Sequence, residues 1–551
     1  MKKTTLFFCL MITQSDLFGQ HLPDNARVKW GNEMHFTKKM TPSEVVASDQ
    51  SGYYLMKEGY AQESRHSQTL LYLEKFDRNL QYVKSVDLSH QNLPGNPRFV
   101  QLVSWGQQLW LFYTADPKNN GAVGLYRVAV DSESLLPAGI SHLVMEIKSQ
   151  AANIGWGITG TATLPLFQFY PVPEKNKLLI IQADGGLKTR EKQVDLLVVD
   201  QQFCTIWKRE ATIKSSSDAL EIVHALLDSE GNAHLLSKSM PNRIGLAALF
   251  KREKYYYSLH SITDNGIHLL HKEINLKEAQ INAAAIQVDQ EGHLYFGGFY
   301  TTDATATKGS GGTYFLKLVG TTQAVIQQKM ESFDATFLTR GLSEGRAKRK
   351  SRKLDQGKKV EDSYFFLDRI FVRNDGSVTF VGEDRQGIGT SSRSKSANSR
   401  VRSEVNFHCY YGSIVLVDFS PNGERKWAEK IAKHQQSSND FGGYFSYSVS
   451  MINDNLYFVF NDNVNNSGYN GGKVERFSPR GFKEHMMTFA RVNRAGTIER
   501  SSFATKHNRN MMTITSVNIQ TDDYEMVVYG QHKKKYRLAR LEFDPKVLAA
   551  E

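Results

Sequence analysis

Short apolar runs separated by tight polar turns recur along almost the whole chain, about eight times in 551 residues. Two clear copies cover residues 285–298 and 370–382, where one apolar run enters a turn and a second apolar run leaves it. Glycine, asparagine and aspartate occupy the turns, as expected where the backbone needs positive φ or a local side-chain hydrogen bond. Each copy therefore predicts a β-hairpin.

A second pattern follows each hairpin. A longer apolar run comes next, and most copies continue with another turn and a short strand, as in residues 413–427. Each unit is thus predicted to contain four strands. The hairpin turns of eight such units lie at residues 49–52, 105–108, 174–177, 228–231, 289–292, 374–376, 453–455 and 521–523.

Eight units of four strands, with almost no helical periodicity, predict an all-β fold: a β-propeller of about eight four-stranded blades. Seven blades are the alternative count, and two separate β domains divided near residue 350 are the alternative architecture. The last unit ends at Phe543 with too few residues left for an outer strand, whereas residues 27–30 precede the first full unit. We expect this N-terminal segment to join the last blade and close the ring, which removes exposed sheet edges.

The first 20 residues have the pattern of a secretory signal peptide, with Lys2 and Lys3, an apolar stretch over residues 6–12 and the small residue Gly19. The competing interpretation is a short helix or frayed N-terminus of a cytosolic protein. The apolar stretch is far shorter than the ~20 residues of a membrane helix, and no later segment approaches that length. We therefore expect secretion, or a periplasmic or cell-surface location, and a single propeller domain over residues 21–551.

Two cysteines, Cys204 and Cys409, belong to that domain. Each lies in an apolar stretch of a different unit, so a disulfide between them is disfavoured. We expect two buried free thiols.

Positive charge is concentrated in two short stretches. Residues 340–359 hold nine basic and two acidic residues, and residues 385–402 hold five basic and no acidic ones, so they carry +7 and +5 of the net +11 and leave −1 elsewhere. Both stretches are poor in apolar residues and predict flexible basic insertions, near residues 336–361 and 385–405. The candidate anion-binding residues are Arg346, Lys348, Arg349, Lys350, Arg352, Lys353, Arg393, Lys395, Arg400 and Arg402.

Such insertions suit an acidic polysaccharide or an anionic lipid surface. Nucleic acid is disfavoured, because neither stretch has the aromatic residues on which bases stack. The alternative interpretation is that both insertions are solvated segments that keep the protein soluble.

Residues 461–472 form an unusual polar stretch. Oxygen-bearing side chains there suit Ca²⁺ or sugar hydroxyl groups, although asparagine and glycine are also ordinary turn residues. The candidate ligand-binding residues are Asn461, Asp462, Asn463, Asn465, Asn466 and Tyr469.

No known arrangement of catalytic residues is recognisable. His268 and His271 have an odd separation, which places them on opposite faces of a strand. Scattered carboxylates lie mostly where turns favour aspartate, and they form no evident pair for sugar hydrolysis. We assign no catalytic residue, no metal-ligating set and no cofactor.

Two segments carry a resemblance to known families. Residues 289–318, with Gly-His-Leu-Tyr-Phe-Gly-Gly-Phe-Tyr followed by Gly-Thr-Tyr-Phe-Leu-Lys-Leu, resemble SBBP-type bacterial β-propeller repeats. Residues 411–435 and 457–462 look like uncharacterised secreted propeller-like proteins of Bacteroidetes. The resemblance implies an envelope or extracellular propeller, and it brings no catalytic residues.

These patterns favour a non-catalytic binding or scaffold module with an anionic or carbohydrate ligand. Its expected partners are a polysaccharide, an anionic surface or another envelope protein. The alternative is a carbohydrate-active enzyme, a glycoside hydrolase or lyase, whose site is assembled on the propeller face from loops of several blades.

Overall fold

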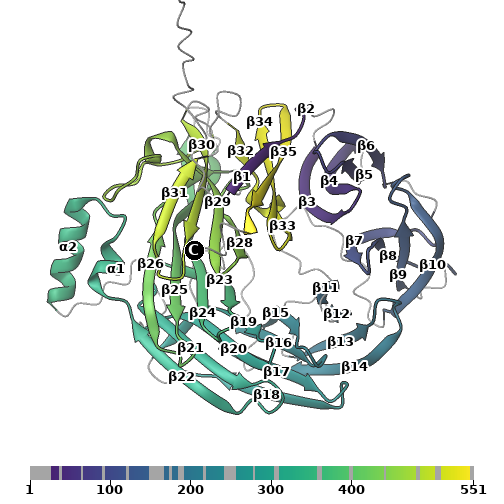
Figure 1. Ribbon diagram of the computed structural model, residues 1–551, viewed down its shortest axis with the longest axis horizontal. Helices are drawn as coiled ribbons and strands as arrows, with labels where there is room; N and C mark the ends of the chain where they lie inside the picture. Colours follow the sequence, from purple (N-terminus) through teal and green to yellow (C-terminus); the bar gives the residue numbers. More distant parts are fainter. Residues whose placement is uncertain are drawn as a thin grey trace, which may run out of the picture.

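The computed structural model describes residues 26–35, 40–63, 66–89, 93–118, 123–147, 167–172, 176–183, 191–214, 219–240, 256–276, 279–302, 309–356, 363–395, 401–439, 442–479, 484–502 and 511–545. Eight antiparallel sheets stand around one axis, as Figure 1 shows. The fold is the predicted β-propeller, with eight blades and not seven. All eight sheets belong to one ring, so the alternative of two β domains is wrong.

The first four blades follow one another in sequence, each with its first strand nearest the axis. Their strands are β3 (Met40–Asp49), β4 (Gly52–Glu63), β5 (His66–Phe76) and β6 (Tyr82–Asp87) in blade 1, β7 (Arg98–Trp105), β8 (Gln108–Ala115), β9 (Gly124–Val130) and β10 (Pro137–Glu146) in blade 2, β11 (Phe167–Val172), β12 (Lys177–Ala183), β13 (Glu191–Val199) and β14 (Thr205–Lys214) in blade 3, and β15 (Ala219–Leu227), β16 (Ala233–Met240), β17 (Tyr256–Thr263) and β18 (His268–Ile274) in blade 4.

Blades 5 to 7 repeat this order, and blade 6 has a fifth strand, β27, paired with β25. Their strands are β19 (Gln280–Val288), β20 (His293–Thr301), β21 (Gly312–Val319) and β22 (Val325–Ser332) in blade 5, β23 (Phe365–Val372), β24 (Val378–Lys395), β25 (Val401–Phe419), β26 (Arg425–Ile431) and β27 (Gln435–Ser438) in blade 6, and β28 (Ser448–Ile452), β29 (Asn455–Asn463), β30 (His485–Val492) and β31 (Ile498–Ser502) in blade 7.

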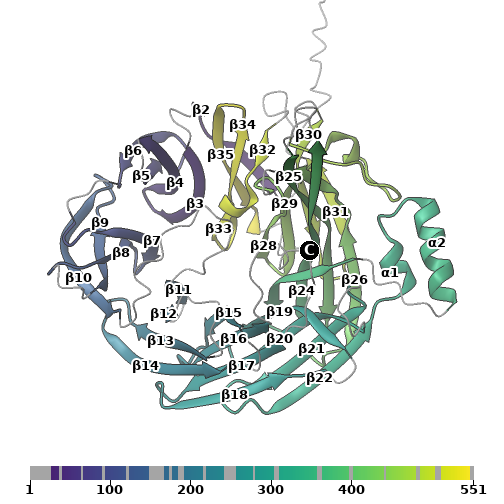
Figure 2. The same ribbon diagram turned by 180° about the vertical axis from the view of Figure 1, so that it is seen from behind.

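Blade 8 combines strands from both ends of the chain. Its strands are β32 (Met512–Thr513), β33 (Ile519–Asp522), β34 (Glu525–His532) and β35 (Lys535–Phe543), to which β1 (Ala26–Trp30) and β2 (Met34–His35) are added. Two helices, α1 (Ala335–Thr339) and α2 (Glu344–Asp355), lie outside the ring beside β26, and Figure 2 shows the same arrangement from behind.

The ring has two unlike faces. The predicted hairpin turns all join the two inner strands of a blade, and we call their side the turn face. The opposite side carries the longer connections, and we call it the loop face. Aspartates cap several of these turns: Asp228 Oδ1, for example, accepts the backbone N–H of Glu230, Gly231 and Asn232 at 2.8–3.0 Å. Turn chemistry of this kind is why the sequence located the blades correctly.

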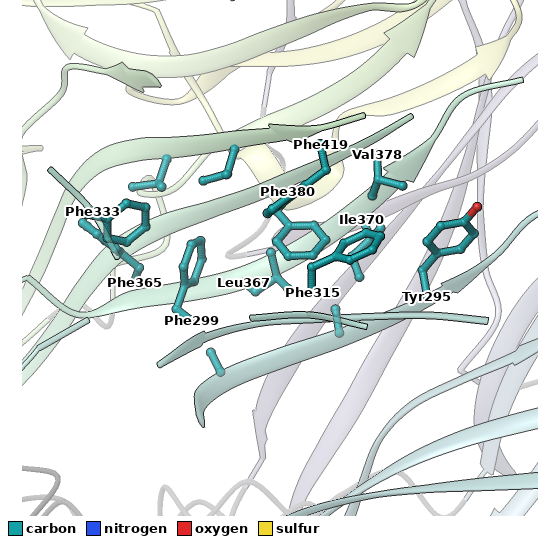
Figure 3. Packing of buried hydrophobic residues seen from close by; sticks show 14 of the residues in the cluster. Tyr295, Phe299, Phe315, Phe333, Phe365, Leu367, Ile370, Val378, Phe380 and Phe419 are labelled. Atoms are coloured by element: carbon teal, nitrogen blue, oxygen red, sulfur yellow. The ribbon is translucent and has the colours of Figure 1, made fainter. Parts of the chain in front are cut away.

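Apolar cores lie between neighbouring blades. Figure 3 shows the aromatic cluster between blades 5 and 6, where the Phe299 and Phe365 ring centroids are 5.6 Å apart and those of Phe315 and Phe380 are 6.2 Å apart. Close packing of this cluster requires a glycine at position 297, because a Cβ there would collide with the Phe380 ring. Each blade therefore depends on its neighbour to bury its faces.

The two ends of the chain meet where the sequence predicts. Strand β1 pairs antiparallel with β35, with Ala26 opposite Phe543 and Trp30 opposite Ala539. The prediction that the N-terminal segment closes the ring is confirmed.

A buried network also ties blade 8 to blade 1 at the turn face. Glu525 accepts hydrogen bonds from the hydroxyl groups of Tyr53 (2.8 Å) and Thr521 (2.6 Å), and it forms ion pairs with Arg78 (3.3 Å) and Arg540 (3.6 Å). The Glu525 carboxylate thus contacts four partners, two from each side of the junction between blades 8 and 1, which we call the seam.

The prediction for the cysteines is correct for one thiol. Both cysteines are free and Cys409 is buried, but Cys204 is exposed. Cys204 lies in the turn before β14, where its carbonyl accepts the Asp200 N–H, and not inside a strand.

Glu525→Ala should destabilise the ring by about 3 kcal/mol, because the buried Tyr53 hydroxyl and the partly buried Arg78 and Arg540 would lose their acceptor. Glu542→Ala is the matched control, since Glu542 contacts the same Arg540 but its side chain is 46% exposed. The control should cost less than about 1 kcal/mol. Urea denaturation followed by tryptophan fluorescence measures both, and equal losses would contradict the role of the Glu525 network.

Candidate functional site

Both basic insertions lie at the loop face beside blade 6: the first connects blade 5 to blade 6, and the second extends from the sheet of blade 6 itself. Helix α2 lies in the connection between β22 and β23, and the second insertion extends β24 and β25. The first insertion follows Ser332 at the end of β22, which lies opposite Gly312, and it leads into β23, where Phe365 lies opposite Asp384. This pairing places both insertions at the same end of the two sheets.

Neither insertion is an irregular loop throughout. Residues 344–355 form helix α2, because lysine, arginine, alanine and leucine are good helix formers and the charges suit the helix ends. Strands β24 and β25 continue as a two-stranded arm, paired from Arg385 opposite Tyr411 to Lys395 opposite Val401. These residues thus have regular secondary structure, and the predicted flexibility of the two insertions stays a prediction.

The candidate cations on α2 divide between two sides of the helix. Leu354 packs on the core of blades 5 and 6, and Lys350 is buried. The remaining five cations are exposed: Arg346, Lys348, Arg349, Arg352 and Lys353. Within the helix, Lys348 also contacts Glu344 at 2.6 Å. The outer side of α2 is thus a row of positive charges, which we call the basic helix surface.

Buried charges seat this helix on blade 6. Lys430 Nζ lies 4.5 Å from the Phe337 ring centroid and 5.3 Å from that of Phe365. Burial, together with the nearby Lys350 charge, lowers the pKa of Lys430 to about 7. Burial also raises the pKa of Asp384 to about 6, although the charge of Lys430 opposes this shift. The underside of α2 therefore rests on a partly desolvated group of charges.

Three of the other four candidate cations lie on the arm. Arg393 and Lys395 belong to β24 and Arg402 to β25, at the end of the arm far from the blade, while Arg400 lies outside the described residues. At its base the arm packs through Cys409 on Phe445, Phe477 and Met512 of the segments around blades 7 and 8. The role of these four residues in anion binding stays a prediction.

The polar stretch at residues 461–472 uses its side chains to hold its own fold. Asp462 Oδ1 accepts the Asn463 N–H (2.8 Å) and the Asn466 amide (2.7 Å), and its other oxygen pairs with Arg500. Asn461 donates to the carbonyls of Tyr444 and Thr513, each at 2.7 Å.

Similar contacts involve the rest of this stretch. Asn463 Oδ1 accepts the Asn465 N–H at 2.9 Å, and the Tyr469 hydroxyl donates to the Gly472 carbonyl at 3.0 Å. Asn461, Asp462, Asn463 and Asn466 are buried. These contacts explain the composition of the stretch by turn chemistry, and ligand binding there stays a prediction.

One group in blade 5 has residue types that bind metals. Ligand atoms of Asp289, Glu291 and His293 lie within 4.8 Å of one another. However, Asp289 Oδ1 accepts the backbone N–H of Glu291 (3.0 Å) and His293 (2.8 Å), while its Oδ2 accepts the Tyr295 hydroxyl (3.0 Å). Asp228 makes the same backbone contacts in blade 4, so the turn itself accounts for Asp289.

A group of charges that the sequence does not reveal lies between blades 6 and 7 at the loop face. Its members, which we call the inter-blade charge cluster, are Asp368, Glu383, Arg385, Lys433 and Tyr447. They are spread over β23, β24 and the segment between β26 and β28, so no local motif joins them. Glu383 falls where the apolar period of β24 ends, which is the only sequence signal.

Glu383 is the buried centre of this cluster. Both Glu383 and Lys433 are fully buried and form an ion pair. Arg385 Nε donates to Glu383 Oε2 at 2.6 Å, and the Ser446 hydroxyl donates to the same oxygen at 2.8 Å. Burial lowers the pKa of Lys433, although the Glu383 charge opposes the shift.

Asp368 is the more open carboxylate. Its Oδ2 accepts from the Tyr447 hydroxyl (2.7 Å) and from Arg385 (2.9 Å), and its side chain is 22% exposed. Burial raises the pKa of Asp368 to about 6, although the Arg385 charge opposes this. A carboxyl with such a pKa near solvent is a frequent property of functional sites.

Comparisons with known proteins give no family assignment. No family model and no curated protein sequence matches the chain, so the resemblance to SBBP-type repeats stays a prediction. Solved structures with some similarity include the polysaccharide lyase Uly1, with 10% identity over 94% of this chain and 100% of the other and a TM-score of 0.37. They also include a protein of unknown function from Dyadobacter fermentans DSM 18053 (8% identity, 69% of this chain and 94% of the other, TM-score 0.32) and a Glu150Asp mutant of Synechocystis apocarotenoid oxygenase (9% identity, 76% and 97%, TM-score 0.29). At these scores none supports an inference about activity.

Two sequence predictions concern membranes and secretion. Among the described residues, no helix combines the length and apolar character needed to cross a bilayer. The signal-peptide prediction lies outside the described residues.

Asp384 should make stability depend on pH in a defined direction. Its folded-state pKa of about 6 lies above the ordinary 3.8, so the folded protein holds this proton more tightly. The resulting stabilisation is complete below about pH 4 and is lost as pH rises through about 6. Asp384→Asn cannot titrate, so the melting temperature of the wild type relative to this variant should fall across that window.

The control is Asp375→Asn in the same blade. Burial would raise the pKa of Asp375, but hydrogen bonds from Ser377 lower it overall. The wild type should therefore lose stability relative to this control variant as pH falls, the opposite trend. Thermal denaturation between about pH 3 and 8 measures both differences, and a flat difference for Asp384→Asn would contradict the burial of its charge.

Proposed function

We propose that this protein is a non-catalytic binding module that holds an acidic polysaccharide on the basic helix surface of blade 6. The observation that carries the proposal is the row of five exposed cations along α2, which has one internal acidic partner in Glu344. A helix holds these charges at fixed spacings, and a polyanion meets them together.

The distribution of charge supports a local site. Residues 340–359 and 385–402 carry +7 and +5 of the net +11, and the rest of the chain sums to −1. A long-range attraction would therefore act toward blade 6 and not toward the whole ring.

The chemistry of the surface favours polysaccharide over nucleic acid. Between Glu344 and Asp355 the helix has no aromatic residue on which a base could stack. It also has no large apolar side chain on its exposed side to enter a lipid surface, since Leu354 packs on the core. Carboxylate and sulfate groups along a sugar chain need only cations at suitable spacings.

The second candidate, a glycoside hydrolase or lyase, has less support. Hydrolysis needs two carboxyl groups that reach the sugar from opposite sides. Asp368 and Glu383 share Arg385, but Glu383 is fully buried and paired with Lys433. A carboxylate that is fully buried in an ion pair suits a structural role better than the role of a nucleophile or general base.

The location follows from the ligand and from the N-terminal sequence. Lys2, Lys3 and the apolar residues 6–12 support secretion or an envelope location, where acidic polysaccharides are accessible. Secretion is part of this proposal.

Replacing Arg346, Arg349 and Lys353 together by glutamine should weaken binding to heparin, used as the polyanion probe, by about 100-fold at low salt. The estimate takes roughly 1 kcal/mol for each cation near an anionic surface. The dependence of affinity on salt should also become less steep, because fewer counterions are released.

The control variant changes Lys118, Lys208 and Lys329 to glutamine, which removes three exposed cations that lie outside blade 6. It should keep most of the affinity. Equal losses in the two triple variants would show that only net charge matters, and unchanged retention of the α2 variant would place the site elsewhere. A hydrolysis assay on the bound polysaccharides tests the enzyme alternative.

A further inference from the structure

A β-bulge recurs in the innermost strands of several blades, and in blade 6 the bulged residue is an aspartate. The inner strands of blades 2, 4, 5 and 6 each contain one register shift that leaves one residue without a partner on the next strand. These residues are Val100, Val223, Asn282 and Asp368. Valine occupies the position in two blades, so the bulge itself does not require a carboxylate.

The bulge brings three side chains of β23 to one side of blade 6. Phe366 lies opposite Glu383 and Arg369 lies opposite Val381, and cross-strand partners point to the same side of a sheet. Val381 packs in the core between blades 6 and 7, and Glu383 contacts Ser446 of the segment before β28. Phe366 and Arg369 therefore flank Asp368 on the side that faces blade 7. Bulges often redirect side chains in this way next to binding sites.

These side chains are accessible, unlike the centre of the cluster. Phe366 is 43% exposed, Arg369 is exposed, and the side chains of Asp368 and Arg385 are 22% and 29% exposed. Among the described residues, hydrogen bonds to Asp368 reach Oδ2 from Tyr447 and Arg385. Its Oδ1 remains as an acceptor on a carboxylate held in a fixed orientation.

The charges of the site sum to a small positive excess. Asp368 and Glu383 are balanced by Arg385 and Lys433, with which they form ion pairs. Arg369 adds a further cation on the exposed side. A ligand that carries both hydroxyl groups and one acidic group would match this set.

We propose that Phe366, Asp368, Arg369 and Arg385 bind one acidic sugar unit at the inner edge of blade 6. Sugar hydroxyl groups donate to Asp368, the sugar carboxylate pairs with Arg369 and the exposed side of Arg385, and the apolar face of the ring packs on Phe366. This second site rests on the proposed function, because it would bind the same class of polysaccharide as the basic helix surface.

The test uses a trisaccharide of galacturonic acid and its carboxyl-reduced, neutral counterpart as probes, with binding measured by isothermal titration calorimetry. Wild-type protein should bind the acidic trisaccharide saturably, and the neutral one at least tenfold more weakly. Asp368→Asn keeps one acceptor oxygen for Tyr447 and Arg385 but replaces the other oxygen by an NH2 donor. This variant and Arg369→Gln should each weaken binding of the acidic trisaccharide about tenfold or more.

Two controls separate this site from structural effects and from α2. Asn282→Ala changes the equivalent bulge of blade 5 and should bind the trisaccharide as the wild type does. Replacement of Arg346, Arg349 and Lys353 should leave trisaccharide binding unchanged while reducing retention on heparin, and Asp368→Asn should do the reverse. Melting temperatures confirm that each variant is folded.

Three results would overturn the proposal. The first is that the wild type shows no saturable binding up to about 10 mM trisaccharide, a concentration at which even a weak millimolar site would fill. The second is that the two trisaccharides bind equally well. The third is that both Asp368→Asn and Arg369→Gln bind the acidic trisaccharide as strongly as the wild type does. Loss of the heparin effect alone would overturn the role of α2 and leave the trisaccharide result to decide this site.

Discussion

Burial of both faces of every blade is the constraint on which this structure depends. A four-stranded sheet that is apolar on both sides cannot be stable alone, so each core is shared between neighbours, as between blades 5 and 6. Eight such shared cores require a closed ring, and the ring closes only because β1 completes the last blade. The network around Glu525 strengthens the same seam with buried polar contacts, which a core of aliphatic residues does not orient so specifically.

Buried charge also lies in the core between blades 6 and 7. Between blades 6 and 7 the apolar packing of Val381, Leu416 and Phe458 gives way, toward the loop face, to the inter-blade charge cluster. Two fully buried charges, Glu383 and Lys433, are costly to desolvate and compensate one another. This arrangement holds Arg385 and Asp368 in position beside the inner strand, and the same blade carries the basic helix surface on its outer side. Blade 6 is thus the part of the ring whose composition is least explained by folding.

The sequence predicts the repeated parts of this fold and misses the parts that do not repeat. Turn residues such as Asp228 and Asp289 mark the blades because their backbone contacts recur, and residues 27–30 identify the seam because the last unit lacks a strand. Helix α2 was missed because one packed residue, Leu354, is too weak a signal among many cations. The inter-blade charge cluster was missed because its members lie far apart in the chain. Cys204 was misplaced because it lies between Phe203 and the apolar start of β14, one residue before that strand begins.

Strand β1 has a consequence for the order of folding. It is made first, yet its partner β35 is made last, so the earliest segment of the ring must wait for the latest. The contact joins positions separated by more than 500 residues, which gives it a large loop-closure cost unless the intervening blades have already formed. We infer that the blades condense from one another during synthesis and that the seam is sealed at the end. Until then the open edge of β35 is the most vulnerable surface for pairing with another chain.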